Sequence, residues 1–220
     1  MMSVVTVERK VLEKNDQVAD IIRGQFKRQN IIALNLLSSP GSGKTTLLER
    51  TLELLSGHII SAVIEGDVQT DIDAQRIAKH HVPVVQIVTN GGCHLDAMLV
   101  RDALAELPLD GVQMLFIENV GNLVCPASYD LGENYKVVIV STTEGDDKPV
   151  KYPKMFRVAN VCVLSKIDLL DHVDFDIDRF KAHARMINPD LLFFATSAET
   201  GDGFDKWTDW LRQLLKMRSL

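Results

Sequence analysis

One stretch of the sequence joins an apolar run, a glycine-rich turn and a helical run without a break. Residues 31–37 (IIALNLL) have the length and composition of a buried strand. Residues 45–55 (TTLLERTLELL) are predicted to be helical, and the turn between the two runs reads SSPGSGKT. Backbone N–H groups of such a turn, together with a helix N-terminus, form a binding site for phosphate groups. The stretch therefore predicts an α/β domain with a phosphate-binding loop.

The residue types within this turn point to a bound nucleotide. The Lys44 ammonium would reach the β and γ phosphates, and the Thr45 hydroxyl would bind Mg²⁺. Ser38 stands where the usual P-loop pattern has its first glycine, and a purely structural glycine turn is the alternative interpretation. We assign a catalytic role to Lys44 and predict that nucleotide is bound by six consecutive residues: Gly41, Ser42, Gly43, Lys44, Thr45 and Thr46.

Further apolar runs of strand length follow along the chain, and helical stretches separate most of them. The runs are IISAVIE, VPVVQIV, VQMLFIE, YKVVIVS, ANVCVLS and LLFFATS. Such an alternation predicts a mainly parallel sheet covered by helices on both faces, the three-layer α/β architecture of P-loop NTPases. We expect this P-loop domain to span residues 31–220 and residues 1–30 to form a helical segment packed on it.

Helical spacing within two segments predicts which side chains pack on the sheet. Residues 11–29 carry apolar side chains near one face, and the last helix carries a second apolar stripe that we expect to belong to the core. The members are Val11, Val18, Ile22 and Phe26 in the first set, and Phe204, Trp207, Leu211 and Leu214 in the second.

Charge and composition exclude several classes of function. The formal net charge of −6 argues against a partner bound through phosphate attraction, so no nucleic acid is expected. The sequence contains no apolar run long enough to span a bilayer and no signal-peptide core, so no membrane association is expected. Three cysteines indicate reduced thiols, and hence a cytoplasmic protein.

Two later segments predict that the base is guanine. Ser165-Lys166-Ile167-Asp168 follows a predicted strand and resembles the N-K-x-D motif of GTPases. The Asp168 carboxylate can accept hydrogen bonds from guanine N1–H and the N2 amino group, which adenine lacks. Lys166 would lie along the guanine ring. Ser165 replaces the usual Asn, so the supporting hydrogen bond that this Asn makes in the base pocket is not expected in the same form. Ser197 and Ala198 belong to the loop expected to close over the base.

Acidic residues at strand ends predict how Mg²⁺ is held. Glu118 ends the strand MLFIE, and Gly121 stands where GTPases sense the γ-phosphate through a backbone N–H. Asp67 follows another strand and should face the same edge of the sheet. We assign Thr45, Asp67 and Glu118 to Mg²⁺ and give Asp67 the alternative catalytic task of holding the attacking water. Asp71 and Asp73 are the further candidates.

Two cysteines and a histidine form a candidate site for a softer metal. Cys93 immediately precedes the predicted helix HLDAMLVRDAL, and His94 is its first residue. Cys125 follows a different strand. Two thiolates and an imidazole suit Zn²⁺, Ni²⁺ or Cu. Inert packing of the thiols is the alternative, and it is the interpretation we prefer for Cys162, which lies inside an apolar strand.

Taken together, these motifs resemble the HypB family of GTPases, which assist nickel insertion into [NiFe]-hydrogenase. The resemblance covers nearly all of residues 30–215, and CHLDA with ENVGNLVCPA distinguishes the chain from the related urease GTPases. It also rests on the segments SSPGSGKTTLL, EGDVQTDIDAQRI, STTEGDD and SKIDL.

The resemblance implies a nickel metallochaperone that hydrolyses GTP slowly, roughly 10⁻⁴ to 10⁻² per second without a partner. It implies Mg²⁺-GTP at the P-loop, Ni²⁺ or Zn²⁺ at Cys93, His94 and Cys125, and a homodimer. The implied partners are a hydrogenase large-subunit precursor and an accessory nickel-delivery protein of the HypA type. No cysteine motif or His-rich tract precedes residue 30, so no separate nickel-storage site is expected.

Two other functions and one interface residue complete the expectations. The chain could instead be a GTPase that serves urease or a cobalamin enzyme, or a metal-binding dimer whose nucleotide site does not hydrolyse GTP. Lys148, after the strand VVIVSTT, is the candidate for reaching across a dimer interface toward the nucleotide or an acidic residue. A solvated lysine in a polar turn is the alternative for this residue.

Overall fold

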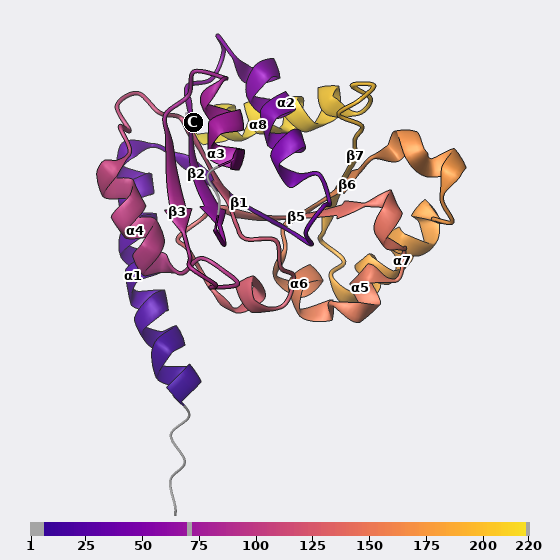
Figure 1. Ribbon diagram of the computed structural model, residues 1–220, viewed down its shortest axis with the longest axis horizontal. Coiled ribbons are helices and arrows are strands. Elements are labelled where there is room, and N and C mark those ends of the chain that lie inside the picture. The colour runs from indigo at the N-terminus through magenta and orange to yellow at the C-terminus, as the bar shows by residue number, and fades with distance from the viewer. Residues whose placement is uncertain (1–6, 70–71, 219–220) are drawn as a thin grey trace, which may run out of the picture.

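The computed structural model describes residues 7–69 and 72–218, and its centre is a seven-stranded, all-parallel sheet. The strand order is β3-β2-β4-β1-β5-β6-β7, and Figure 1 shows β2 and β3 on one side of the sheet and β6 and β7 on the other. All seven strands overlap the apolar runs predicted from the sequence, and β1 and β2 extend past these runs to Ser38 and Asp67. Their bounds are Ile32–Ser38 (β1), Ser61–Asp67 (β2), Val84–Val88 (β3), Met114–Glu118 (β4), Tyr135–Ser141 (β5), Val161–Ser165 (β6) and Leu192–Ala195 (β7).

Helices cover both faces of this sheet, so the three-layer α/β prediction is confirmed (Figure 1). One face packs against α2 (Lys44–Leu55), α3 (Ile72–Ala78) and α8 (Phe204–Arg218). The other face packs against two groups of helices, α1 with α4 on one side and the α6–α7 region on the other. The remaining bounds are Val7–Gln29 (α1), Ala97–Glu106 (α4), Lys148–Lys151 (α5), Pro153–Val158 (α6) and Ile177–Ile187 (α7), with 3₁₀ turns at Cys125–Ser128 (η1), Thr142–Glu144 (η2) and Ile167–His172 (η3).

Helix α1 packs on the sheet through its second half only. Val18, Ile22 and Phe26 are buried against the core as predicted. Val11 is 48% exposed, so the expectation that it lies in the same apolar contact is wrong. The reason is visible in Figure 1, where the first turns of α1 extend past the edge of the domain and have no layer to pack against.

The apolar stripe of α8 is core, as its spacing predicts. Phe204, Trp207, Leu211 and Leu214 are all buried in the same cluster as the β1 side chains. The Trp207 indole N–H also donates to the Thr51 hydroxyl of α2 at 2.9 Å, which satisfies its polar atom inside the core.

Helix α4 begins later than the sequence suggested. The predicted helix started at His94, whereas α4 starts at Ala97 and Asp96 is its N-cap, accepting from the Leu99 amide at 2.9 Å. An aspartate is a strong N-cap because its carboxylate satisfies an amide that has no partner within the helix. Cys93 and His94 therefore lie in the loop that precedes the helix.

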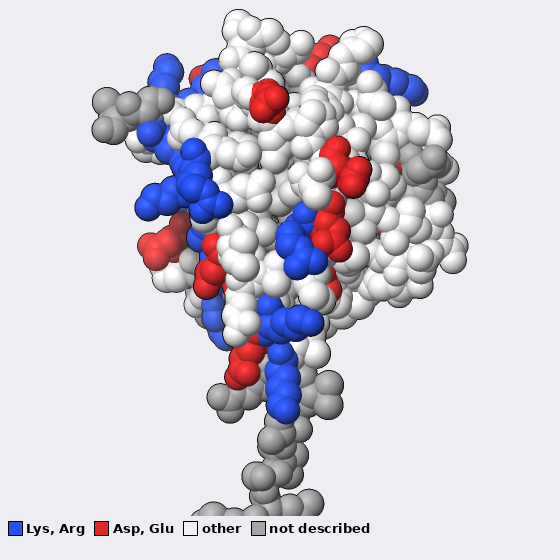
Figure 2. All heavy atoms as spheres, turned by 90° about the vertical axis from the view of Figure 1, so that its left-hand side faces the viewer, with Lys and Arg blue, Asp and Glu red and all other residues white. Residues whose placement is uncertain are grey.

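The described helices include none long and apolar enough to cross a membrane. On the face that carries α1 and α4, basic and acidic side chains are interspersed along α1 (Figure 2).

Candidate nucleotide and metal sites

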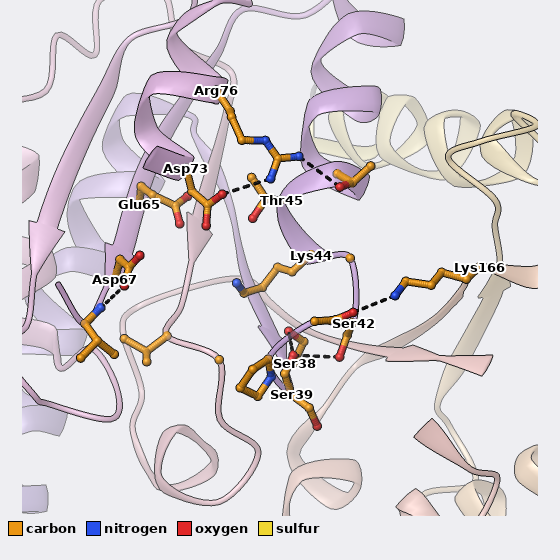
Figure 3. Close-up of a pocket in the computed structure, with 18 residues that line it drawn as sticks. Ser38, Ser39, Ser42, Lys44, Thr45, Glu65, Asp67, Asp73, Arg76 and Lys166 are labelled. Carbon is orange, nitrogen blue, oxygen red and sulfur yellow. Dashed lines mark hydrogen bonds and ion pairs between the residues drawn. The ribbon is translucent and has the colours of Figure 1, made fainter. Parts of the chain in front are cut away.

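The glycine-rich turn forms the floor of a cavity at the carboxyl end of β1. It connects the end of β1 to α2, and the cavity above it has a volume of about 550 Å³. Gly43 caps α2 with a φ of 83°, a left-handed conformation that side chains rarely adopt. The N-terminus of a 12-residue helix thus faces the cavity. The predicted loop residues 41–46 all line this cavity (Figure 3).

Lys44 and Thr45 both contact the acid that ends β4. Lys44 Nζ lies 2.7 Å from Glu118 Oε1, and the Thr45 hydroxyl donates to the same oxygen at 2.6 Å. Glu118 itself is fully buried. Burial alone would lower the pKa of Lys44, but the charge and hydrogen bond of Glu118 outweigh it and raise that pKa. The lysine is therefore charged and held beside the cavity.

A second buried acid, which was not predicted from the sequence, lies next to Glu118. Glu65 of β2 is 1% exposed and is the register partner of Glu118 on the neighbouring strand. Burial and the nearby Glu118 raise the pKa of Glu65 to about 10. Ligand atoms of Glu65, Glu118 and Asp73 lie within 4.8 Å of one another, a group able to hold a metal ion.

The structure places Asp67 and Asp73 differently. Asp67 lines the cavity, and its Oδ1 accepts from the backbone amides of Val68 and Gln69. Asp73 of α3 stands beside Glu65 and faces Thr45 (Figure 3), and Arg76 holds it with an ion pair of 3.1 Å. Asp71, the other candidate, lies outside the described residues.

The predicted base pocket adjoins the phosphate cavity. Its volume is about 360 Å³, and Lys166, Asp168 and Ala198 are among the residues that line it. Gly43, Thr46 and Lys166 line both cavities, so the two are contiguous.

Ser165 makes contacts that link the base pocket to the phosphate loop. Its hydroxyl donates to the Ser42 carbonyl at 2.6 Å, and Lys166 Nζ donates to the Gly41 carbonyl at 2.8 Å. Ser165 thus anchors the loop despite replacing the usual Asn. Ser197 is fully buried, and its hydroxyl accepts from the Thr200 amide within its own turn.

Cys93, His94 and Cys125 come together although they belong to two separate loops. Their ligand atoms lie within 4.8 Å of one another. The hydrogen bond with Cys125 and burial raise the pKa of Cys93, because both favour the neutral thiol, and the charge of a Cys125 thiolate acts in the same direction. Burial lowers the pKa of His94, which favours the neutral imidazole that can bind a metal. The Tyr129 ring packs on His94 with 3.9 Å between centroids.

The loop that carries Cys93 and His94 is fixed to the ends of β2 and β4. Leu95, fully buried, follows His94, and its amide donates to Asn119 Oδ1 at 3.1 Å. A Cβ on Gly66 would lie 2.8 Å from the Leu95 side chain, so only glycine permits this contact. The Thr89 amide donates to the Asp67 carbonyl at 2.9 Å, and the Thr89 hydroxyl donates to the Gly92 carbonyl at 2.7 Å.

Lys148 is held within its own chain. Its Nζ lies 2.9 Å from Glu144 Oε1 and 3.0 Å from the Ser39 hydroxyl, and the side chain is 14% exposed. The alternative of a freely solvated lysine is therefore wrong. Glu144 in turn accepts from the Ser42 hydroxyl at 2.7 Å, so this network contacts the phosphate loop.

The chain matches a known nucleotide-binding family over most of its length. The family model of the CobW/HypB/UreG nucleotide-binding domain matches residues 32–195, which include the phosphate loop and both cysteines of the thiol site. The hydrogenase maturation factor HypB of Azotobacter chroococcum mcd 1 is 53% identical over 210 residues, which are 95% of this chain and 68% of that protein.

Two solved structures share the fold over most of the chain. HypB from Archaeoglobus fulgidus has a TM-score of 0.86 and 39% identity, covering 92% of this chain and 99% of that one. HypB from Helicobacter pylori in complex with nickel has a TM-score of 0.88 and 35% identity, covering 93% and 96%.

Proposed function

This chain belongs to the HypB group of the CobW/HypB/UreG family, and from that membership we propose a GTP-hydrolysing metallochaperone that helps deliver nickel to [NiFe]-hydrogenase. The observation that carries the proposal is the joint placement of the two sites. The Cys93-His94 loop is bonded to the strand ends that carry Asp67 and Glu118, next to the phosphate loop.

The residues of the phosphate cavity fit a Mg²⁺-nucleotide. Glu65 Oε2 and Glu118 Oε2 are buried oxygens without a hydrogen-bond partner among the described residues, and a cation would satisfy them. Mg²⁺, held by Thr45, Glu118 and Asp67, would neutralise charge on the β and γ phosphate oxygens. Lys44 would leave Glu118 and bind the phosphates, while the Gly121 amide, on the loop packed against Pro40, would sense the γ-phosphate.

Hydrolysis needs a group that orients water toward the γ-phosphate. We assign this task to Asp67, because it lines the cavity at the end of β2. The carboxylate would hold the water in line with the leaving group, which supplies orientation and little covalent chemistry. Turnover without a partner is expected to be slow, roughly 10⁻⁴ to 10⁻² per second.

The base pocket supports selection of GTP over ATP. Asp168 stands at its edge and would accept from guanine N1–H and N2–H. Adenine would leave that carboxylate unpaired, and a site built on such hydrogen bonds rejects the wrong partner strongly.

Nickel would be the cargo of the thiol site rather than a resident cofactor. Two thiolates and a neutral imidazole suit Ni²⁺ and Zn²⁺ alike, and the similar HypB from Helicobacter pylori was solved in complex with nickel. The proposal includes a homodimer in the cytoplasm that works with the hydrogenase large-subunit precursor and a HypA-type nickel-delivery protein. Lys148, already close to the phosphate loop, is the residue proposed to contact the second subunit's nucleotide.

The test is nucleotide turnover and metal content of the purified chain. The unmodified protein should turn over GTP and not ATP, and Asp168→Asn should shift its preference toward xanthine nucleotides. Lys44→Ala should abolish turnover without unfolding the chain. Equal GTP and ATP turnover would refute the guanine assignment, and failure to bind Ni²⁺ or Zn²⁺ would refute the metallochaperone.

A further inference from the structure

Glu65 is a buried acid to which no part of the proposed reaction assigns a task. It occupies the last-but-two position of β2, directly beside Glu118 in the sheet, and its side chain lines the phosphate cavity. Its Oε2 atom is buried and has no hydrogen-bond partner among the described residues. In Figure 3 its carboxyl group lies side by side with that of Asp73, facing Thr45.

Such an arrangement is costly without a cation. Two carboxyl groups in contact in a buried site repel when both are charged, and an unpaired buried oxygen loses its hydration. Lys44 forms an ion pair with Glu118, and it also acts on Glu65 at longer range. If Lys44 turns to the phosphates of a nucleotide, both carboxyl groups lose their nearest positive charge.

The neighbouring acids are less suited to replace Glu65 in this position. Asp73 is tied to Arg76, which also pairs with Glu49 of α2. Asp67 turns its Oδ1 toward its own backbone amides. Glu65 is therefore the acid that lines the cavity and also has a buried carboxylate oxygen without a hydrogen-bond partner among the described residues.

We propose that Glu65 is a positioning residue for the nucleotide-bound Mg²⁺, and that its Oε2 would accept a hydrogen bond from a water on the cation that Thr45 and Glu118 would hold. Mg²⁺ dehydrates reluctantly and keeps several waters in such sites, so a second carboxylate can act through that shell. This inference rests on the proposed function, since it presupposes that Mg²⁺-nucleotide binds here.

The test uses the full chain with the substitution Glu65→Gln, which keeps the size of the side chain and removes its ability to ionise when a cation binds. Mn²⁺ replaces Mg²⁺ as the probe, and its affinity for the protein–GDP complex is measured by electron paramagnetic resonance of the free ion. Loss of an outer-shell partner typically weakens metal binding roughly 10- to 100-fold, and a drop in that range is expected. GDP affinity in the presence of EDTA should not change, because the substitution acts on the cation.

Glu53→Gln is the matched control, since it removes a glutamate charge from the exposed side of α2, where Glu53 pairs with Arg50. Its Mn²⁺ affinity should equal that of the unmodified protein. If Glu65→Gln does not fold, Glu65→Asp is the deciding variant. It keeps the carboxyl group but shortens the side chain by one methylene, so it should also weaken the binding of Mn²⁺.

The outcomes separate the two ideas. A folded Glu65→Gln protein that binds Mn²⁺ as tightly as the unmodified chain overturns the role of Glu65 and leaves the proposed function intact. An unmodified protein that binds neither GDP nor Mn²⁺ overturns the proposed function itself.

Discussion

The Thr89 hydroxyl offers a small perturbation of the link between the nucleotide and metal sites. Thr89 follows β3, and its hydroxyl donates to the Gly92 carbonyl, immediately before Cys93, at 2.7 Å. Its backbone amide donates to the Asp67 carbonyl at 2.9 Å. Thr89→Val keeps the shape of the side chain and the hydrogen bond of the backbone amide, and it removes only the hydroxyl.

The size of the effect follows from the loss of one hydrogen bond. A typical net contribution is about 0.5–1.5 kcal/mol. If the whole amount serves to order the Cys93 loop, metal affinity should fall about 2- to 13-fold, since 1.4 kcal/mol is a factor of ten. Thr89 is only half-buried and water can reach the freed carbonyl, so the lower half of this range is expected.

The assay is a Co²⁺ titration followed by the visible absorption of the thiolate complex, with Zn²⁺ competition for the tighter state. GTP affinity measured without metal at the thiols should stay unchanged, because among the described residues the Thr89 hydroxyl bonds only to the backbone carbonyls of Asp67 and Gly92 and not to the Asp67 carboxylate or the phosphate loop. Thr208→Val is the control: it removes a similar 2.8 Å hydroxyl bond, to the Phe204 carbonyl in α8, far from the metal. Equal metal affinity in Thr89→Val and the unmodified chain would show that this hydroxyl does not order the loop.

Three further outcomes follow from the geometry. Ni²⁺ or Zn²⁺ affinity should differ roughly 5- to 150-fold between the GDP state and a state with a non-hydrolysable GTP analogue. Cys125→Ser should remove most of that difference. Equal metal affinities in the two states would refute coupling between the nucleotide and metal sites. Lys148→Ala should lower the dimer fraction in sedimentation with a GTP analogue, and an unchanged fraction would limit Lys148 to its intrachain contacts. Burial alone would raise the pKa of Asp130, but the Gly132 amide and Arg23 outweigh it and lower that pKa. The stability from Asp130 is thus present above its unfolded pKa of about 3.9 and is lost as the pH falls through the lower folded value. Asp130→Asn should therefore have a lower Tm than the unmodified chain at pH 7, and the difference in Tm should become smaller below about pH 4. A difference in Tm that does not change with pH would contradict this.

Local sequence was enough for the sheet and for the phosphate loop. Each strand lies within a run of mostly apolar residues, so its signal is contained in a few neighbouring positions. Gly43 and Lys44 are likewise recognisable because a helix N-terminus that follows a glycine turn is a local feature.

The position of Glu65 could not be obtained in that way. Its sequence context, an acid near the end of an apolar run, is the same one that identified Glu118. What makes the residue notable is that β2 and β4 are neighbours in register, and that pairing joins positions 53 residues apart in the chain. Val11 shows the opposite error, because helical periodicity identifies a face but not where the domain under that face ends.

The same non-local pairing explains why the two sites are joined so closely. Strands β2 and β4 carry the acids of the phosphate cavity at their ends, and the same two ends hold Leu95 through Gly66 and Asn119. Leu95 is fully buried, and a packed core transmits a displacement rather than absorbing it. Under the proposed function, a shift of either strand end on loss of the γ-phosphate would therefore move His94 relative to Cys125. Linkage then requires the reciprocal effect, so a metal held at the thiols must alter GTP affinity by the same factor.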